Sequence, residues 1–279
     1  MWQLDLDGGG FTALEVAPSN PPVTAGAYRP FIDGLNLWFS DQDSEEVELP
    51  LGGGPYPLVD PYGENSFFVD AKWIYFPPAT PVGIFGRVPR LAWVDAGLDV
   101  IEGNATAVAI DDGWAYVATA GTPPDCTDGT IEAVPLAGGE HRILAGEQHD
   151  PIAVALDGQR IYWLNQGEFG CVVGAVPLAG DGALLVVGMD GGQVAALASG
   201  LTWPGSLTVA GQWAYWTEDV LTDDVAIQAL YLDGGSPMTL ATGQPTETAP
   251  TLLASGGALF WNDTGTLDAG FKDGRVMEL

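Results

Sequence analysis

Residues 214–219 read AYWTED, and three other stretches share this pattern of an aromatic pair followed by a short polar tail. They are IYWLNQ at 161–166, LNLWFSD at 35–41 and ALFWNDT at 258–264. With IYF at 74–76 and AYV at 115–117, the chain holds six copies, centred on residues 38, 75, 116, 162, 215 and 260. Successive centres are 37 to 53 residues apart, and this spacing suits the four-stranded blade of a β-propeller.

Each copy lies within the same order of apolar segments. One segment precedes it, as in PIAVALDG at 151–158, and the Asp-Gly link after that segment is typical of a hairpin turn. A short fourth segment closes each unit, and in the poorest copy the last two segments are 90–97 and 98–103. The third segment has a repeated ending, seen in VELPLGGG at 47–54, IEAVPLAGG at 131–139, VGAVPLAGD at 173–181 and IQALYLDGG at 227–235. The aromatic pair is therefore predicted on the second strand of each blade, where large side chains fill the space between sheets.

The composition agrees with an all-β protein. The chain has 279 residues with 39 Gly and 21 Pro, and no long stretch places apolar residues at helical spacing. We predict a single all-β domain over residues 1–279, a six-bladed β-propeller with antiparallel four-stranded blades. The expected blades are about 28–60, 64–104, 105–148, 149–200, 204–244, and 248–279 together with 1–17.

The two ends of the chain are expected to share the last blade. Residues 2–16 have the pattern of third and fourth strands, whereas 251–261 have that of a first and second strand. Pairing them would close the ring and remove exposed sheet edges. The segment GRVMEL at 274–279 also has the pattern of a third strand. We favour a C-terminal third strand beside an N-terminal fourth strand.

The repeat resembles the YWTD repeat of six-bladed propellers, found in lipoprotein-receptor ectodomains and in exported bacterial relatives. The literal match is Tyr215-Trp216-Thr217-Glu218, and Tyr231-Leu232-Asp233-Gly234 stands where that family has its LDG turn. All six repeats fit loosely, so the resemblance covers nearly the whole chain. It implies a fold and says almost nothing about function.

The charge excludes several classes of partner. The formal net charge is −29 with only 8 Lys and Arg, which argues against nucleic-acid binding and against docking on an anionic membrane. No apolar run is long enough to span a bilayer, and no export signal is recognisable, so we expect that any signal has been removed or was never present. The acidity agrees with cation binding, basic partners or solubility alone, and we favour solubility.

The predicted ligand face carries the loops between second and third strands and the links between blades. Aromatic residues beside polar groups suit sugar or peptide contacts, although they would equally serve to cap the blades. The candidates in these loops are Tyr62, Phe169, Trp203 and Phe271.

Two acidic runs on the same face are candidates for holding calcium, which prefers six to eight oxygen ligands. Neither contains a complete calcium-loop motif, so solvated acidic loops are the favoured interpretation. The candidates are Asp41, Asp43, Glu218, Asp219, Asp223 and Asp224. Four other aspartates recur in the hairpin after the first strand, on the far face, where a turn-forming role is expected: Asp33, Asp70, Asp111 and Asp157.

His149 and Asp150 are the candidates for catalysis, because a histidine beside a carboxylate has the chemistry of a base or a metal ligand. The one other histidine, His141, is expected next to a hairpin on the opposite face, so a two-histidine metal site is not favoured. No recognisable hydrolase, metalloprotease or nucleotide-binding motif is present.

Cys126 and Cys171 occupy nearly equivalent points in the second-to-third-strand loops of adjacent blades. Both stand in polar loops, whereas free cysteines are usually buried, so we predict a disulfide between them. A disulfide would agree with an oxidising compartment. We therefore expect an exported protein of the periplasm, the cell surface or the medium.

The favoured function is a non-enzymatic binding or interaction propeller, expected to be a monomer, with a protein, peptide or carbohydrate ligand and no required cofactor. The alternative is a calcium-dependent hydrolase or lyase with its site at the channel mouth. Known six-bladed lactonases and phosphotriesterases gather Glu, Asn and Asp around such an ion. Here the candidate carboxylates do not recur at matching blade positions.

Overall fold

The computed structural model is all-β. It describes residues 2–4, 11–13, 28–32, 36–40, 46–50, 68–69, 72–76, 83–89, 99–168, 180–219, 224–245, 252–255, 258–263 and 275–278. Within these ranges there is no helix of the length and apolar character needed to cross a membrane. The chain divides into two compact units, Met1–Ala79 with Ile84–Gly103 and Thr80–Gly83 with Asn104–Leu279, which are described separately.

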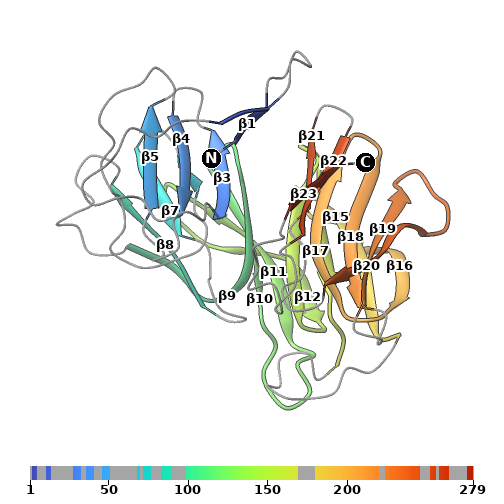
Figure 1. Ribbon diagram of the computed structural model, residues 1–279. Helices are drawn as coiled ribbons and strands as arrows, with labels where there is room; N and C mark the ends of the chain where they lie inside the picture. Colours follow the sequence, from blue (N-terminus) through green and yellow to red (C-terminus); the bar gives the residue numbers. More distant parts are fainter. Residues whose placement is uncertain are drawn as a thin grey trace. The chain divides into compact units, whose positions relative to one another are not determined.

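The first unit contains three groups of antiparallel strands (Figure 1). β1 pairs with β2, β3-β4-β5 form a three-stranded sheet, and β6, β7 and β8 are followed by the first residues of β9. Arg87 of β8 donates to Asp99 at the start of β9 over 2.9 Å, and its guanidinium lies over the ring of Trp73 at 4.1 Å. The strands are β1 (Trp2–Leu4), β2 (Phe11–Ala13), β3 (Tyr28–Ile32), β4 (Asn36–Ser40), β5 (Glu46–Pro50), β6 (Phe68–Val69), β7 (Trp73–Phe76), β8 (Gly83–Pro89) and β9 (Asp99–Asp111).

Apart from Thr80–Gly83, the second unit begins within β9, and it holds most of the described residues. Its antiparallel strands pair in the orders β9-β10-β11-β12, β13-β14-β15-β16, β17-β18-β19-β20 and β21-β22-β23. The further strands are β10 (Trp114–Thr119), β11 (Gly129–Pro135), β12 (Arg142–Gln148), β13 (Pro151–Leu156), β14 (Arg160–Asn165), β15 (Gly182–Gly188), β16 (Ala195–Leu201), β17 (Pro204–Ala210), β18 (Trp213–Asp219), β19 (Asp224–Tyr231), β20 (Met238–Pro245), β21 (Leu252–Ser255), β22 (Ala258–Asp263) and β23 (Arg275–Glu278).

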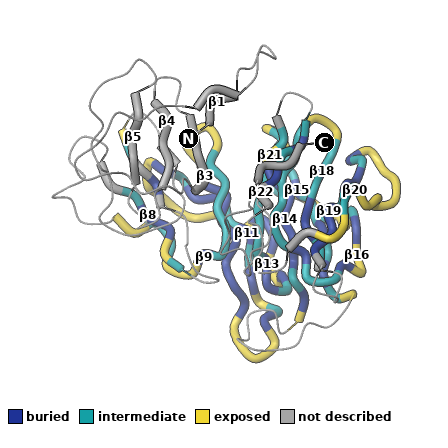
Figure 2. The backbone as a smooth tube through the Cα atoms, in the orientation of Figure 1, coloured by how far each residue is buried: buried dark blue, intermediate teal, exposed yellow. Residues whose placement is uncertain are grey.

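The prediction for the repeated aromatic motif is confirmed. All six copies lie on strands that stand second in their set, namely β4, β7, β10, β14, β18 and β22. Trp163 and Trp216 are completely buried. Trp163 packs with Tyr116 of the preceding sheet, and Trp216 packs with Tyr162 in the same way. Large aromatic side chains thus fill the space between sheets, as their buried area favours, and Figure 2 shows buried residues along β14 and β18.

The first strands of consecutive sheets lie side by side, as the propeller arrangement predicts. β13 contacts β17, and β17 contacts β21. The hydroxyl of Thr106 in β9 donates to the carbonyl of Pro151 in β13, and Leu252 N–H in β21 donates to Ser206 Oγ in β17 at 3.1 Å. Close packing also joins successive sheets at Gly182, where an added Cβ would come within 2.8 Å of Pro204 Cδ.

Two of the predicted third strands are wrong. In the fourth blade the strand that pairs with β14 is Gly182–Gly188 and not 173–181, of which 173–179 lie outside the described residues. The double-glycine turn that ends this strand is Gly191-Gly192, and both residues have positive φ like Gly234-Gly235 in the next sheet. The glycine-rich ending that marks the third strand of this sheet is therefore the one after Gly182–Gly188, and not the similar ending in VGAVPLAGD at 173–181. In the second blade, Gly83–Pro89 pairs with β7 in place of 90–97.

The boundary between the second and third predicted blades is also different. The expected fourth strand 98–103 and the next first strand form one continuous strand, β9. In the two following sheets a proline, Pro151 or Pro204, begins the first strand after a residue of positive φ. Asn104 and Ala105 stand at these places in β9, so nothing there interrupts the extended backbone.

The C-terminal segment Arg275–Glu278 pairs with β22 and supplies the third strand of the last sheet, as we favoured. At the N-terminus, Trp2–Leu4 and Phe11–Ala13 pair with each other. Among the described strands there is no pairing that closes a ring, so ring closure remains a prediction.

Candidate functional site

Three residues occupy the same place in consecutive sheets of the second unit, at one end of the first strands. They are Asn104, Asp150 and Trp203. In each sheet the next residue, Ala105, Pro151 or Pro204, pairs with a residue near the end of the second strand. Asp150 and Trp203 have φ values of 50° and 42°, which side chains with a Cβ rarely adopt. Such backbone conformations are often retained at functional positions, and both residues were candidates from the sequence.

Asp150 is held by loops from two sheets. Its N–H donates to the carbonyl of Cys126 at 3.0 Å, and its carbonyl accepts from Gln166 N–H at 2.9 Å. His149 beside it accepts from Gly167 N–H at 3.1 Å through its backbone carbonyl. The structure thus brings a link between sheets together with two loops between second and third strands.

Asp150 as a whole residue is 3% exposed. Burial raises its pKa from the ordinary 3.8 to about 6, and no hydrogen bond from the described part of the chain offsets this shift. Burial disfavours the charged form of this carboxyl group, because it removes part of the water that would solvate the charge. This site would therefore favour a partner that brings hydrogen-bond donors.

A buried polar network lies next to Asp150. Gln148 Oε1 accepts from Trp163 Nε1 at 2.9 Å and from Asn165 Nδ2 at 3.2 Å, while Gln148 Nε2 donates to the carbonyl of Gly146 at 2.7 Å. Asn165 Oδ1 is buried and has no hydrogen-bond partner. Asn165 pairs in register with Pro151, the residue after Asp150. A buried acceptor without a donor and a desolvated carboxyl group therefore belong to neighbouring positions at this end of the sheet.

Sequence reasoning missed Gln148 and Asn165. Asn165 belongs to the polar tail of its aromatic motif, which we interpreted only as the place where the strand leaves the sheet. Gln148 directly precedes the His149-Asp150 pair. Both are polar residues at the end of an apolar segment, and this pattern could have marked them as candidates for a buried polar network.

In the next sheet Trp203 takes the place of Asp150 and is partly exposed. Glu218 fixes the segment before it, since Oε1 accepts from Thr202 N–H at 2.7 Å and Oε2 accepts from the indole N–H of Trp216 at 3.4 Å. Both carboxylate oxygens of this predicted cation ligand therefore hold the protein's own groups. Asp219 and Asp224 lie at adjoining ends of β18 and β19.

Cys126 is completely buried, so the expectation that it lies exposed in a polar loop is wrong. Its φ is 56°, and an added Cβ on Gly121 would overlap its backbone, which shows how tightly this loop folds on itself. None of the cysteines in the described residues is free. The predicted partner, Cys171, lies outside the described residues.

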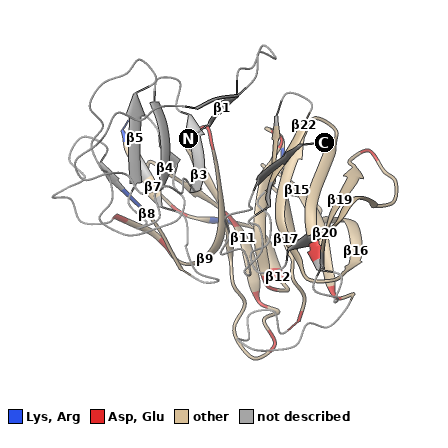
Figure 3. Ribbon diagram, in the orientation of Figure 1, with Lys and Arg blue, Asp and Glu red and all other residues tan. Residues whose placement is uncertain are grey.

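Most other candidates also lie outside the described residues, so their roles remain predictions. They are Asp41, Asp43, Tyr62, Phe169, Asp223 and Phe271. In the described residues of the second unit, Asp and Glu residues lie mainly near the ends of strands and in the turns (Figure 3).

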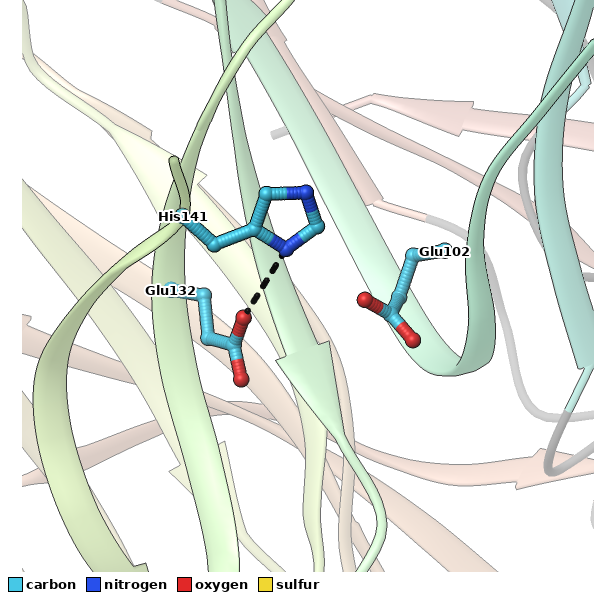
Figure 4. A group of neighbouring side chains, drawn as sticks. All are labelled: Glu102, Glu132 and His141. Carbon is cyan, nitrogen blue, oxygen red and sulfur yellow. Dashed lines mark ion pairs between the residues drawn. The ribbon is translucent and has the colours of Figure 1, made fainter. Parts of the chain in front are cut away.

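His141 lies on the segment just before β12 and pairs with Glu132 of β11, with 3.4 Å between Nδ1 and Oε2 (Figure 4). Glu132 Oε1 also accepts from the hydroxyl of Thr130 at 2.8 Å. Glu102, also drawn in Figure 4, belongs to the first unit. His141 and the His149-Asp150 pair therefore lie at opposite ends of β12, since His141 precedes this strand and His149 follows it.

No protein-family model and no curated protein matches the chain. Its structure is similar to a TolB-like protein from Agrobacterium tumefaciens, with a TM-score of 0.50 and 14% identity over 78% of this chain and 81% of that one. It is also similar to an oligogalacturonate lyase solved in complex with manganese, with a TM-score of 0.51 and 12% identity over 88% and 73% of the two chains. The tricorn protease gives a TM-score of 0.53 and 16% identity over 90% of this chain, which spans only 26% of the protease.

These likenesses show the fold alone. Together with the antiparallel four-stranded sheets, they define an all-β protein with a β-propeller-like fold.

Proposed function

We propose that the chain is a non-enzymatic binding protein and that its ligand face surrounds Asp150 and Trp203. The observation that carries this proposal is the buried acceptor without a donor, Asn165 Oδ1, next to the desolvated carboxyl group of Asp150 at the end of β13 and β14. Each buried acceptor left without a donor costs about 1–3 kcal/mol. A ligand that brings hydroxyl or N–H groups to this place would recover part of that cost on binding.

A neutral carbohydrate is the ligand class that fits these groups best. Sugar hydroxyl groups donate to carboxylate and amide oxygens, and sugar rings stack on aromatic faces such as that of Trp203. The net charge of −29 disfavours acidic ligands at any site on this protein. A peptide or protein ligand would use the same acceptors through its N–H groups.

The test is calorimetric titration with neutral hexasaccharides of cellulose, starch, xylan and chitin. We expect one of them to bind, and we expect Trp203→Ala and Asp150→Ala to weaken that binding at least about 10-fold, which corresponds to 1.4 kcal/mol. Trp114→Ala is the matched control, since Trp114 is a partly exposed tryptophan at the opposite end of its sheet. Equal affinity in the Trp203→Ala variant would contradict the proposal.

The alternative is a hydrolase or lyase that depends on a divalent cation held near the channel mouth. Calcium titration distinguishes the two functions, because an ion bound only to the folded state raises the melting temperature. We expect no substantial rise with micromolar calcium. A large rise that a chelator abolishes would favour the alternative.

We further propose that six blades close into a ring and that Cys126 pairs with Cys171 in an exported, monomeric protein. The location of all six aromatic motifs on second strands supports the blade count, and the lack of a free cysteine among described residues supports the pairing. Deleting residues 1–16 should expose a sheet edge and cost several kcal/mol with a tendency to aggregate. Unchanged stability and solubility would argue against closure.

A further inference from the structure

The opposite end of the sheets, where each first and second strand are joined, shows a difference between two otherwise equivalent places. In the sheet β13–β16, the hydroxyl of Tyr162 donates to Asp157 Oδ2 at 2.7 Å. Arg160 pairs with the same carboxylate through Nε and Nη2, both at 2.9 Å, and its guanidinium lies over the ring of Tyr162 at 5.5 Å. The carboxylate of Asp157 therefore accepts hydrogen bonds from both the tyrosine hydroxyl and the guanidinium.

The preceding sheet has the same acid and tyrosine, but the position of the arginine is taken by Trp114. Strand pairing makes Asp111 equivalent to Asp157, Tyr116 equivalent to Tyr162, and Trp114 equivalent to Arg160. Tyr116 is 6% exposed, and none of the described residues forms a hydrogen bond with its hydroxyl group. Tyr116 is thus more than nine-tenths buried, and its hydroxyl group lacks, among the described residues, the carboxylate partner that Tyr162 has in Asp157.

A pocket of about 430 Å³ occupies this place between the two sheets. Trp114 and Tyr116 form part of its wall, with Asp111 and Asp112 from one hairpin, Gln159 from the next, and Asp190 from the turn after β15. Because these residues come from both neighbouring sheets, the pocket depends on how the sheets pack within the second unit.

The electrostatics of the pocket favour a cation. Burial raises the pKa of Tyr116, the nearby carboxylates Asp111, Asp190 and Asp112 raise it further, and the positive charge of Arg142 lowers it in part. One cation lies at the rim, where Arg142 donates to the carbonyl of Met189 at 2.8 Å and lies 5.9 Å from the ring centre of Trp114. In the described residues Arg142 forms no ion pair with the three carboxylates, so their charge is not neutralised by direct pairing.

We propose that this pocket binds a guanidinium group, the arginine side chain of a peptide ligand, in the place that Arg160 fills between the next two sheets. Asp111 would accept two of its N–H groups, as Asp157 does from Arg160, and Trp114 would cover its planar face. A guanidinium suits both contacts because it is planar, permanently charged and a forked donor. The site lies at the other end of the strands from Asp150 and does not depend on the proposed ligand face.

The test is calorimetric titration with N-acetyl-L-argininamide, using N-acetyl-L-citrullinamide as the neutral analogue of the same shape. We expect the arginine probe to bind at least about 10-fold more tightly than the citrulline probe, because only the first forms charge-assisted hydrogen bonds. Trp114→Arg should place the protein's own guanidinium in the pocket and weaken binding of the arginine probe by about 10-fold or more. Asp111→Asn should weaken it by about 5-fold.

Asp125→Asn is the control, since it removes one exposed carboxylate in a different loop and leaves the pocket intact. Its affinity should stay within about twofold of the parent protein, as for surface changes away from a site. If Trp114→Arg does not fold, Asp111→Asn and Trp114→Ala carry the test in its place. The proposal is overturned if both probes bind equally, if neither binds, or if Asp125→Asn weakens binding as much as Asp111→Asn.

Discussion

Trp163 and Gln148 are joined by a hydrogen bond of 2.9 Å from the indole N–H to Oε1. The bond links the buried core of one sheet to the end of the strand that precedes Asp150. In the following sheet Trp216 uses Glu218 instead, at 3.4 Å, and the residue equivalent to Gln148 is Leu201. The candidate site is therefore built on a polar anchor that is particular to one sheet.

Replacing Gln148 by leucine, the residue at the equivalent position of the next sheet, tests the role of this hydrogen bond. Gln148→Leu would leave the N–H groups of Trp163 and Asn165 without their acceptor in a buried setting. We expect a loss of about 2–4 kcal/mol in the free energy of unfolding, since each lost partner costs about 1–3 kcal/mol. Urea denaturation measures it, and a loss below about 0.5 kcal/mol would show that water replaces Gln148.

The buried tryptophans should make the largest individual contributions to stability. Trp163→Ala and Trp216→Ala should each cost about 3–5 kcal/mol through lost burial and cavity formation. Trp114→Ala, at a position 38% exposed, serves as the control and should cost much less. Denaturant unfolding of the three variants gives the comparison. A cost under about 1 kcal/mol at Trp163 or Trp216 would contradict their packing between sheets.

Asp150 should give the protein a characteristic dependence of stability on pH. Its folded-state pKa of about 6 exceeds the ordinary 3.8, so the folded protein holds this proton more tightly than the unfolded chain. The contribution is complete below pH 3.8 and is lost as the pH rises through about 6. Asp150→Asn should therefore melt at a higher temperature than the parent protein at pH 8, with the difference shrinking toward pH 4.

The comparison between parent and variant removes the effect of the other acids, which repel one another more as the pH rises. Melting curves by circular dichroism from pH 4 to pH 8 provide the measurement. A difference in melting temperature that is the same at every pH would mean that the Asp150 carboxyl has an ordinary pKa.

Repetition explains which parts of the fold were predictable. Each aromatic pair must fill the same space between sheets, so it recurs at the same strand and could be located from spacing alone. The third strand of the fourth blade was mistaken because VGAVPLAGD and GALLVVGMDGG both fit an apolar strand ending in a glycine turn. Sequence similarity alone did not distinguish the two, whereas register with β14 does.

The candidate site was only partly predictable for a different reason. His149, Asp150 and Trp203 were recognised because their residue types stood in loops of the expected face. The unpaired Asn165 Oδ1 and the pocket at Tyr116 depend on which side chains the folded sheets bring together, and the sequence alone does not show those contacts. Comparing Trp114 with Arg160 became informative only when strand pairing made them equivalent.

The proposed disulfide is tested by counting thiols in the denatured, unreduced protein. We expect no reactive thiol per chain before reduction and two after it, because the chain has two cysteines. Reduction should also lower stability by up to a few kcal/mol, since the bond would restrict the unfolded chain. Two thiols without reduction would remove both the bridge and the main support for export.

The central claim, a ligand face at Asp150 and Trp203, is tested most directly by nuclear magnetic resonance of protein labelled with ¹⁵N. The indole N–H signals of Trp203 and Trp114 are assigned from Trp203→Phe and Trp114→Phe, and the hexasaccharides of cellulose, starch, xylan and chitin are then titrated in turn. We predict that the sugar that binds shifts the Trp203 signal and leaves the Trp114 signal in place. A sugar that binds but shifts Trp114 and not Trp203, or a complete lack of binding by all four, would contradict the account.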